Sequence, residues 1–437
     1  MQKVDQLIHA KWLITCEPNQ AVLEHYALVC HKGLISAILP SHEAKLLYDA
    51  DQELHLPTHA LLPGFINSHT HSAMNLFRGL ADDLELMDWL NNHIWPAEGK
   101  WVSDELVFDG TQLALAEMIR SGTTCFNDMY FFLDATARAV ELAGLRANIG
   151  MTVIDVPTAW AKTSDEYFQK SIEFYQQYKN HPMVIPTLAP HSTYTVSIEN
   201  LIRINELSKN YGLKINIHLQ EAPAEINQSL SLHQKRPLQR LYEIGMLSPN
   251  LIAVHMTQIN EADLDILQET QPNIVHCPES NMKLASGVAP VEKLMSHGLN
   301  VSLGTDGAAS NNDLNMLGEM RSAAFLSKLI NNNPKSLSAE TVLQMATLNG
   351  AKTLGMEHLI GSLAIGKSAD MIAIDLDQLE TQPLYHPISQ IVYAASRQQV
   401  TDVWVAGKQL LKNRQLTTID EKELLKKAQK WRNRIKN

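Results

Sequence analysis

Short apolar runs alternate with longer amphipathic segments through the middle of the chain. Runs that read as buried strands lie at 61–67, 123–128, 146–154, 183–189, 214–219, 251–255, 273–276 and 300–305. Between them, 104–121, 197–210 and 314–330 have the apolar spacing of helices. Eight strands with intervening helices predict a (β/α)8 barrel of the TIM type. A doubly wound sheet stays open as the alternative, because periodicity does not decide whether a sheet closes.

The two ends of the chain share a different pattern, in which apolar and polar positions alternate over short runs with turn residues between them. It covers residues 1–60 and returns at 361–375 and 402–411. We therefore expect a small β-sandwich domain built from both termini, with the barrel inserted between its halves. The expected divisions are 1–60, 61–360 for the barrel, and 361–437, the last part ending in an amphipathic helix.

Composition narrows the classes of function. The net charge is −11 and no basic run reaches five residues, which argues against nucleic acid as a partner. No apolar stretch approaches the roughly 18 residues of a membrane span. The four cysteines are scattered, without the paired spacing of a structural zinc knot, and the N-terminus lacks a signal-peptide pattern. We expect a cytoplasmic protein without membrane contacts.

Residues able to bind a metal recur where the predicted strands end. In a (β/α)8 barrel the carboxyl ends of the strands carry the active site. Two imidazoles separated by one intervening residue on a strand point to the same face of the sheet. A single buried histidine is usually an ordinary core residue. Chance does not easily place metal-binding residue types at the carboxyl ends of five different strands. The set consists of His69, His71, His191, His218, Glu221, His255 and Asp306.

The chemistry of this set predicts a hydrolytic metal centre. Three imidazoles (His69, His71 and His218) and the Asp306 carboxylate suit Zn²⁺, and Fe²⁺ or Mn²⁺ are also accommodated. The fourth strand has no lysine that could bridge two ions, which favours one metal per subunit. Such an ion lowers the pKa of water to about 7. Glu221 is the candidate general acid and base, and His255 can hydrogen-bond the hydroxide or an oxyanion.

Several longer segments resemble a known family. These are PGFINSHTHSAMNLFRG at 63–79, HLQE at 218–221, HCPESNMKLASG at 276–287, GTDGAASNNDLNM at 304–316 and GSLAIGKSAD at 361–370. Together they resemble the amidohydrolase superfamily, in the branch of 5-methylthioadenosine/S-adenosylhomocysteine deaminases and triazine hydrolases. The resemblance spans nearly the whole chain. It implies one ion held by three histidines and one aspartate, which correspond here to His69, His71, His218 and Asp306.

The resemblance also implies further roles. Glu221 matches a family glutamate that shuttles protons and contacts the purine. Asp306 matches a family aspartate that takes a proton from the attacking water. Glu98 matches a glutamate that binds ribose hydroxyls, and His191 a substrate-binding histidine. The family often has an arginine near the end of the third strand, whereas Arg146 begins that strand. We expect a homo-oligomeric deaminase that converts 5′-methylthioadenosine, S-adenosylhomocysteine or both to the inosyl product and ammonia.

Two alternatives stay open at this point. A related amidohydrolase could act on another ring, as triazine hydrolases and guanine-type or pterin deaminases do, although Glu98 favours a substrate with ribose. A non-catalytic scaffold could share the fold, because fold alone does not establish function. The segment 72–101 is rich in aromatic residues, and it could either cover a substrate or pack against the barrel rim.

Overall fold

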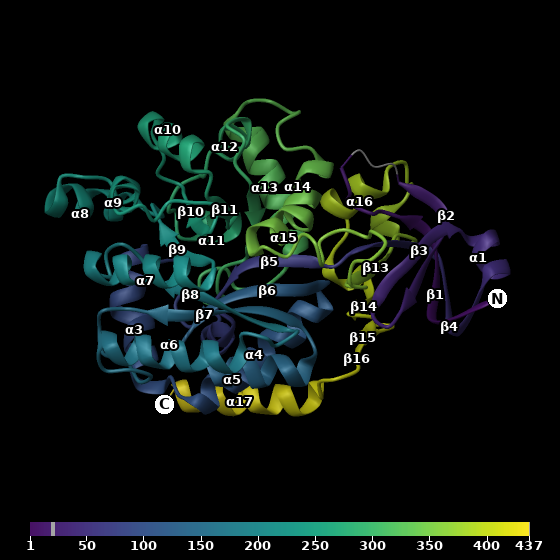
Figure 1. The fold of residues 1–437 in the computed structure, drawn as a ribbon, viewed down its shortest axis with the longest axis horizontal. Coiled ribbons are helices and arrows are strands. Elements are labelled where there is room, and N and C mark those ends of the chain that lie inside the picture. The colour runs from purple at the N-terminus through teal and green to yellow at the C-terminus, as the bar shows by residue number, and fades with distance from the viewer. Residues whose placement is uncertain (19–21, 437) are drawn as a thin grey trace.

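The computed structural model describes residues 1–18 and 22–436, which form a barrel and a separate sheet made from both termini (Figure 1). The barrel strands are β5 (Phe65–Thr70), β6 (Thr123–Tyr130), β7 (Arg146–Val153), β8 (Val184–Pro190), β9 (Ile215–Leu219), β10 (Leu251–His255), β11 (Asn273–His276) and β12 (Val301–Leu303). Each pairs in parallel with its neighbour in chain order. Among the described helices, none is long and apolar enough to cross a membrane.

Hydrogen bonds between the last and first strands close the barrel. The Asp306 amide donates to the His69 carbonyl at 3.0 Å, and the Thr305 amide donates to Asn67 Oδ1 at 3.0 Å. The predicted (β/α)8 barrel is therefore confirmed, and the doubly wound alternative is wrong. His69 and Asp306, both predicted site residues, make this contact. It places the end of β12 directly beside the end of β5.

Helices surround the barrel, and the three expected ones are present as α4 (Asp104–Arg120), α7 (Ile198–Tyr211) and α13 (Met316–Ile330). Local sequence explains their starts, since Ser103 and Ser197 accept backbone N–H groups of the first turn of α4 and α7. The other helices are α5 (Leu133–Ala143), α6 (Ser164–Tyr178), α8 (Pro223–His233), α9 (Pro237–Glu243), α10 (Glu261–Thr270), α11 (Pro278–Lys283), α12 (Val291–Ser296), α14 (Ala339–Met345), α15 (Leu348–Leu354) and α16 (Pro387–Tyr393).

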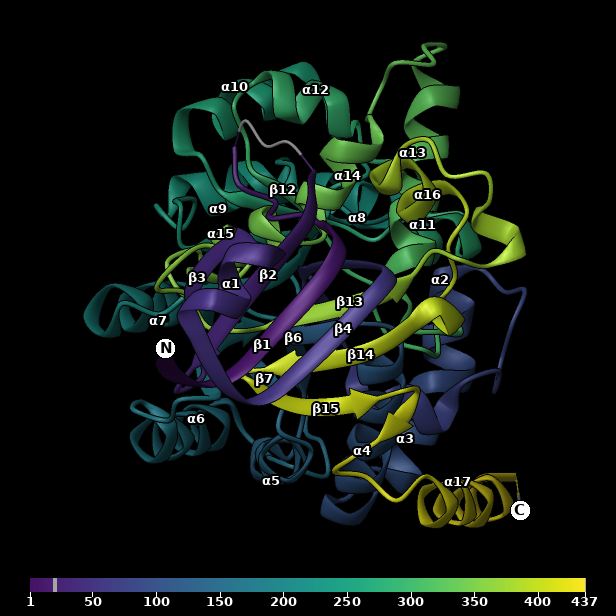
Figure 2. The same ribbon diagram turned by 90° about the vertical axis from the view of Figure 1, so that its right-hand side faces the viewer.

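The terminal segments form one mixed sheet, which confirms the expected β-domain (Figure 2). Its strands are β1 (Gln2–Leu13), β2 (Leu23–His31), β3 (Leu34–Pro40), β4 (Tyr48–Pro63), β13 (Met371–Asp375), β14 (Val400–Val405), β15 (Lys408–Lys412) and β16 (Gln415–Leu416), with α1 (Ser41–Leu47) between β3 and β4. The two halves join where β13 runs antiparallel to β4, with Met371 opposite Pro63. Leu28, Leu61 and Trp404 belong to a hydrophobic core of its own.

The first predicted barrel strand differs from the observed one. The run 61–67 reads as a single strand, but Leu61 and Leu62 are the end of β4, and the barrel strand begins only at Phe65. Gly64 lies between the two sheets, and a Cβ there would come within 2.1 Å of the Thr124 side chain. Both parts are buried, so hydropathy alone could not separate them. We propose that the predicted divisions 1–60, 61–360 and 361–437 describe the domains once the first boundary is moved to Gly64, where β4 has ended.

The segment 72–101 and the C-terminal helix pack together on the barrel. The segment comprises η1 (Ser72–Phe77), α2 (Leu86–Asp88), η2 (Trp89–Ile94) and α3 (Trp95–Trp101). The helix α17 (Glu421–Lys436) runs beside α4 (Figure 1). Its Trp431 is 1% exposed, shares a hydrophobic cluster with the segment, and donates to Asp109 at 2.9 Å. The predicted amphipathic helix therefore buries an apolar face as well as presenting a solvated one.

Candidate metal centre and active site

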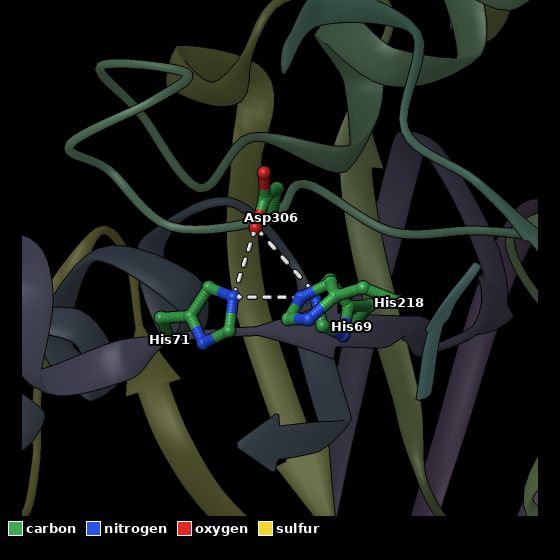
Figure 3. A group of neighbouring side chains, drawn as sticks. All are labelled: His69, His71, His218 and Asp306. Atoms are coloured by element: carbon green, nitrogen blue, oxygen red, sulfur yellow. Dashed lines mark hydrogen bonds and ion pairs between the residues drawn. The ribbon is translucent and has the colours of Figure 1, made fainter. Parts of the chain in front are cut away.

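Four of the predicted ligands meet at the carboxyl ends of the barrel strands (Figure 3). His69 and His71 come from the end of β5, His218 from β9, and Asp306 follows β12. His218 Nε2 lies 3.1 Å from His69 Nε2 and 3.2 Å from His71 Nε2. Asp306 Oδ1 lies 3.4 Å from His69 Nε2 and 3.2 Å from His71 Nε2. The four donor atoms therefore face one point.

This donor set fits a single divalent ion. The Nδ1 atoms of His71 and His218 donate to the carbonyls of Met129 and His191 at 2.6 and 2.8 Å, which leaves the Nε2 lone pairs free to bind an ion. For Zn²⁺ the ligand bonds measure about 2.0–2.1 Å, so tetrahedral ligands lie about 3.3 Å apart. The observed separations of 3.1–3.4 Å match this spacing.

Burial and the Asp306 charge set the protonation of the site. Burial lowers the pKa of His69 to about 4 and that of His218 well below its usual value, so both imidazoles are neutral at neutral pH. Burial also acts on His71, but its hydrogen bond to Asp306 and the charge of that carboxylate raise the pKa of His71 to about 9. The pKa of Asp306 lies well below its ordinary range because His69 and His71 donate to it against the effect of burial. In the metal-free protein, a proton on His71 is stabilised where an ion would bind.

The backbone and two serines fix Asp306 in this arrangement. Asp306 has a φ of 62°, in the left-handed region that non-glycine residues rarely occupy. Its Oδ2 accepts the hydroxyls of Ser280 and Ser310 at 2.7 and 2.8 Å, which turns Oδ1 toward the imidazoles. A Cβ at Gly304 would lie 2.8 Å from the His69 nitrogen, so glycine allows β12 to approach β5 closely. The GTDG sequence is therefore built around the position of one carboxylate.

Glu221 and His255 lie beside the four donors. His255 Nε2 is 3.7 Å from Glu221 Oε2. Asn281 donates to His255 Nδ1 at 3.0 Å, which leaves the histidine proton on Nε2. Glu225 accepts the Glu221 backbone N–H at 2.9 Å and fixes the start of α8. Burial raises the pKa of the Glu221 carboxyl, which makes it better able to carry a proton at neutral pH.

The remaining predicted residues, Glu98 and His191, line the same cavity. Its volume is about 340 Å³, and it is also bordered by His71, His218, Glu221, His255 and Asp306. His69 is fully buried and outside this lining. Tyr130 donates to Glu98 Oε1 at 2.7 Å, and Thr195 lies 2.9 Å from His191 Nδ1. The structure thus brings every predicted site residue to one end of the barrel.

Different residues of the 72–101 segment border the cavity and pack against the barrel. Trp89 and Trp95 border the cavity, together with Leu86, Leu90 and Ile94. Phe77 and Trp101 pack in the cluster that includes Trp431. One face of the segment covers the site, and another holds it to the barrel and to α17.

Sequence reasoning missed several residues that support the site. Tyr130 ends β6, two residues beyond the predicted strand, so a longer strand would have placed it with the other strand-end groups. Ser280, Ser310 and Asn281 lie in motifs that carry the family resemblance, but their partners could not be read from spacing. Arg146 lies at the opposite end of β7, where its guanidinium pairs with Asp370 at 3.1 Å, far from any substrate.

The chain is similar to proteins of known family and structure. The amidohydrolase family model matches residues 60–410. A 5-methylthioadenosine/S-adenosylhomocysteine deaminase from Teredinibacter turnerae is 44% identical over 99% of this chain and 98% of its own length. A deaminase of the same name from Saccharophagus degradans is 44% identical over 99% of this chain and 97% of its own.

Two solved structures extend the comparison. An adenosine deaminase from Xanthomonas campestris with bound zinc has a TM-score of 0.98 and 45% identity, covering 100% of this chain and 99% of its own. An atrazine chlorohydrolase from Arthrobacter aurescens complexed with zinc has a TM-score of 0.91 at 21% identity, covering 98% of this chain and 99% of its own. At that identity the second likeness concerns the fold alone.

Proposed function

The chain belongs to the amidohydrolase family, and from that premise we propose that it deaminates adenosine derivatives with the help of one divalent metal ion. It is a hydrolase of C–N bonds. The observation that carries the proposal is the cavity in which the four-donor cluster, Glu221 and Glu98 meet. The Teredinibacter relative is named for 5′-methylthioadenosine and S-adenosylhomocysteine, which we propose as the substrate class here.

We propose His69, His71, His218 and Asp306 as the metal ligands. Their chemistry and spacing suit Zn²⁺, the ion in the Xanthomonas structure, while Fe²⁺ and Mn²⁺ accept the same donors. When bound, such an ion makes water a nucleophile at neutral pH by lowering its pKa to about 7.

The groups around the cluster would move the protons. Glu221, whose pKa is raised by burial, donates a proton to the purine nitrogen next to the carbon that bears the amino group. His255 presents its Nε2–H, because Asn281 occupies Nδ1, and hydrogen-bonds the oxygen added to that carbon while keeping its proton. Asp306 accepts a proton from the attacking water and passes it to the amino group, which leaves as ammonia. The second proton of the water returns to Glu221 as the carbonyl of the product forms.

Glu98 and His191 would orient the nucleoside. Tyr130 occupies Glu98 Oε1, and the other oxygen remains to accept ribose hydroxyls. Burial lowers the pKa of His191 to about 3, so its imidazole is neutral at neutral pH and acts as a hydrogen-bonding group. A ring without ribose would leave the second carboxylate oxygen of the half-buried Glu98 without a hydroxyl partner, which favours a nucleoside over a free base or a triazine.

Ammonia release from a substrate panel tests the proposal. The purified, metal-loaded protein is assayed with adenosine, 5′-methylthioadenosine, S-adenosylhomocysteine, guanine and a triazine, following ammonia and the ultraviolet change of the purine. We expect turnover of at least one adenosine derivative and none of the triazine. Turnover of guanine or the triazine without any adenosine derivative would contradict the proposal.

A further inference from the structure

Among the described residues, the cavity lining contains no lysine or arginine that could pair with an anion. Among the described residues that line it, the charged groups are the carboxylates Glu98, Glu221 and Asp306, and the rest are imidazoles, neutral polar groups and apolar groups. No lysine or arginine belongs to this lining. A negatively charged part of a substrate would therefore meet neutral hydrogen-bonding groups and carboxylates, but no lysine or arginine, in this lining.

Two apolar segments form most of the wall beyond the reacting groups. The first is the face of η2 and α3 with Trp89, Ile94 and Trp95. The second is the loop after β7, whose residues 156–159 are Val, Pro, Thr and Ala. These side chains offer contact to a thioether or an alkyl group and no charged partner.

Three cationic side chains of neighbouring segments contact other groups. Lys162 Nζ donates to the Thr158 carbonyl at 2.6 Å, behind the loop. Arg240 donates to the Thr193 carbonyl at 3.2 Å, and Arg78 pairs with Glu117. None of these three side chains lines the cavity.

We propose that the site selects adenosine derivatives with a small, uncharged 5′ substituent and discriminates against an amino-acid tail. This inference rests on the proposed function and narrows it, so that 5′-methylthioadenosine is the preferred substrate and S-adenosylhomocysteine a poor one. The tail of the latter carries a carboxylate and an ammonium, both of which lose water on entering the cavity. The carboxylate finds neutral donors but no cation there, and the cost of burying it without a cationic partner outweighs the apolar contacts of the longer tail.

Steady-state kinetics on the metal-loaded protein test this selectivity. We expect kcat/KM for 5′-methylthioadenosine to exceed that for S-adenosylhomocysteine by about 100-fold or more, with adenosine between them. S-adenosylhomocysteine should also be a weak competitive inhibitor, which reports binding separately from chemistry. A difference below about tenfold overturns the inference. If adenosine, 5′-methylthioadenosine and S-adenosylhomocysteine all fail to react, the proposed function fails instead.

A charge introduced at Ala159 tests the physical cause. Ala159 is exposed and borders the cavity, so a longer side chain can be placed there without disturbing the core. Ala159→Arg should raise kcat/KM for S-adenosylhomocysteine at least about tenfold relative to 5′-methylthioadenosine, and Ala159→Gln, similar in length but uncharged, should not. Equal effects of the two variants overturn the charge argument. Loss of S-adenosylhomocysteine turnover in Lys162→Met alone would make Lys162 the carboxylate partner and also overturn it.

Discussion

Removal of the Arg146 guanidinium should destabilise the protein without affecting catalysis. Arg146 and Asp370 are 3% and 1% exposed and join the foot of β7 to the terminal sheet. The guanidinium makes two bonds to Asp370, at 3.1 and 3.2 Å, and donates to the Pro182 carbonyl at 3.0 Å and to the Ser368 hydroxyl at 3.2 Å. Arg146→Met fills similar space but leaves the Asp370 carboxylate buried without its cation.

The size of the stability loss depends on the hydrogen bonds that Asp370 retains in the Arg146→Met variant. Removal of one partner of a buried ion pair typically costs about 3–5 kcal/mol. Asp370 still accepts from Ser368 Oγ at 2.6 Å and from the Ala406 amide at 2.8 Å, which places the loss at the lower end, about 3 kcal/mol. Adding Asp370→Asn removes the uncompensated charge, so the double variant should lose less than the sum of the two single losses.

Urea unfolding followed by circular dichroism measures the loss, and kcat/KM measures the site. The eight residues of β7 separate Arg146 from the active-site end by about 23 Å, so activity at 25 °C should stay within about twofold of the parent. Arg138→Met, which breaks an ion pair with Asp104 whose side chains are 46% and 56% exposed, is the matched control and should lose at most about 1 kcal/mol. An Arg146→Met loss no larger than the control's, or a fall in kcat/KM without loss of stability, would refute the reasoning.

Three further predictions concern the site itself. Glu221→Gln should lower kcat by about 10²–10⁴-fold with unchanged metal content by atomic absorption, and a nearly normal kcat would remove Glu221 from proton transfer. Glu225→Ala deletes the acceptor of the Glu221 N–H and the Thr193 hydroxyl, so kcat should fall about tenfold, with partial recovery in Glu225→Gln; an unchanged kcat would contradict a positioning role. The apparent Zn²⁺ affinity of the metal-free protein should rise about tenfold per pH unit from neutral pH and level off near the His71 pKa of about 9, because His71 must lose its proton before Nε2 can bind. Competition with a chelator measures this, and an affinity independent of pH between 7 and 9 would contradict it.

The barrel and its candidate metal ligands could be placed from the sequence because the relevant signals are local. Each barrel strand is a short buried run, and the groups that follow it inherit a common position from the fold. His218 and Asp306 are 88 residues apart, yet both could be placed because each immediately follows or ends a strand. The boundary misplaced between two different sheets, at Leu61, arises where two buried strands adjoin without a polar residue between them.

The parts that could not be predicted depend on pairings between distant segments. Tyr130 reaches Glu98, which is 32 residues earlier and in a segment without regular periodicity. Arg146 appears from sequence as a strand residue of unassigned role, and only its contact with Asp370, 224 residues away, shows that it joins the two sheets. Side-chain direction and tertiary contacts determine such pairings, and neither is contained in a hydropathy pattern.

The geometry of the candidate metal site also shows why the histidines need the Asp306 carboxylate beside them. With Nδ1 of His71 and of His218 bound to carbonyls, the Nε2 lone pairs would face each other at 3.2 Å if both rings were neutral. The Asp306 carboxylate relieves this in the metal-free protein by stabilising a proton on His71. A Zn²⁺ ion bound by the proposed ligands would replace that proton, so the carboxylate held by Ser280 and Ser310 would couple metal binding to proton release. Asp306→Asn should therefore weaken the pH dependence of metal binding as well as the binding itself.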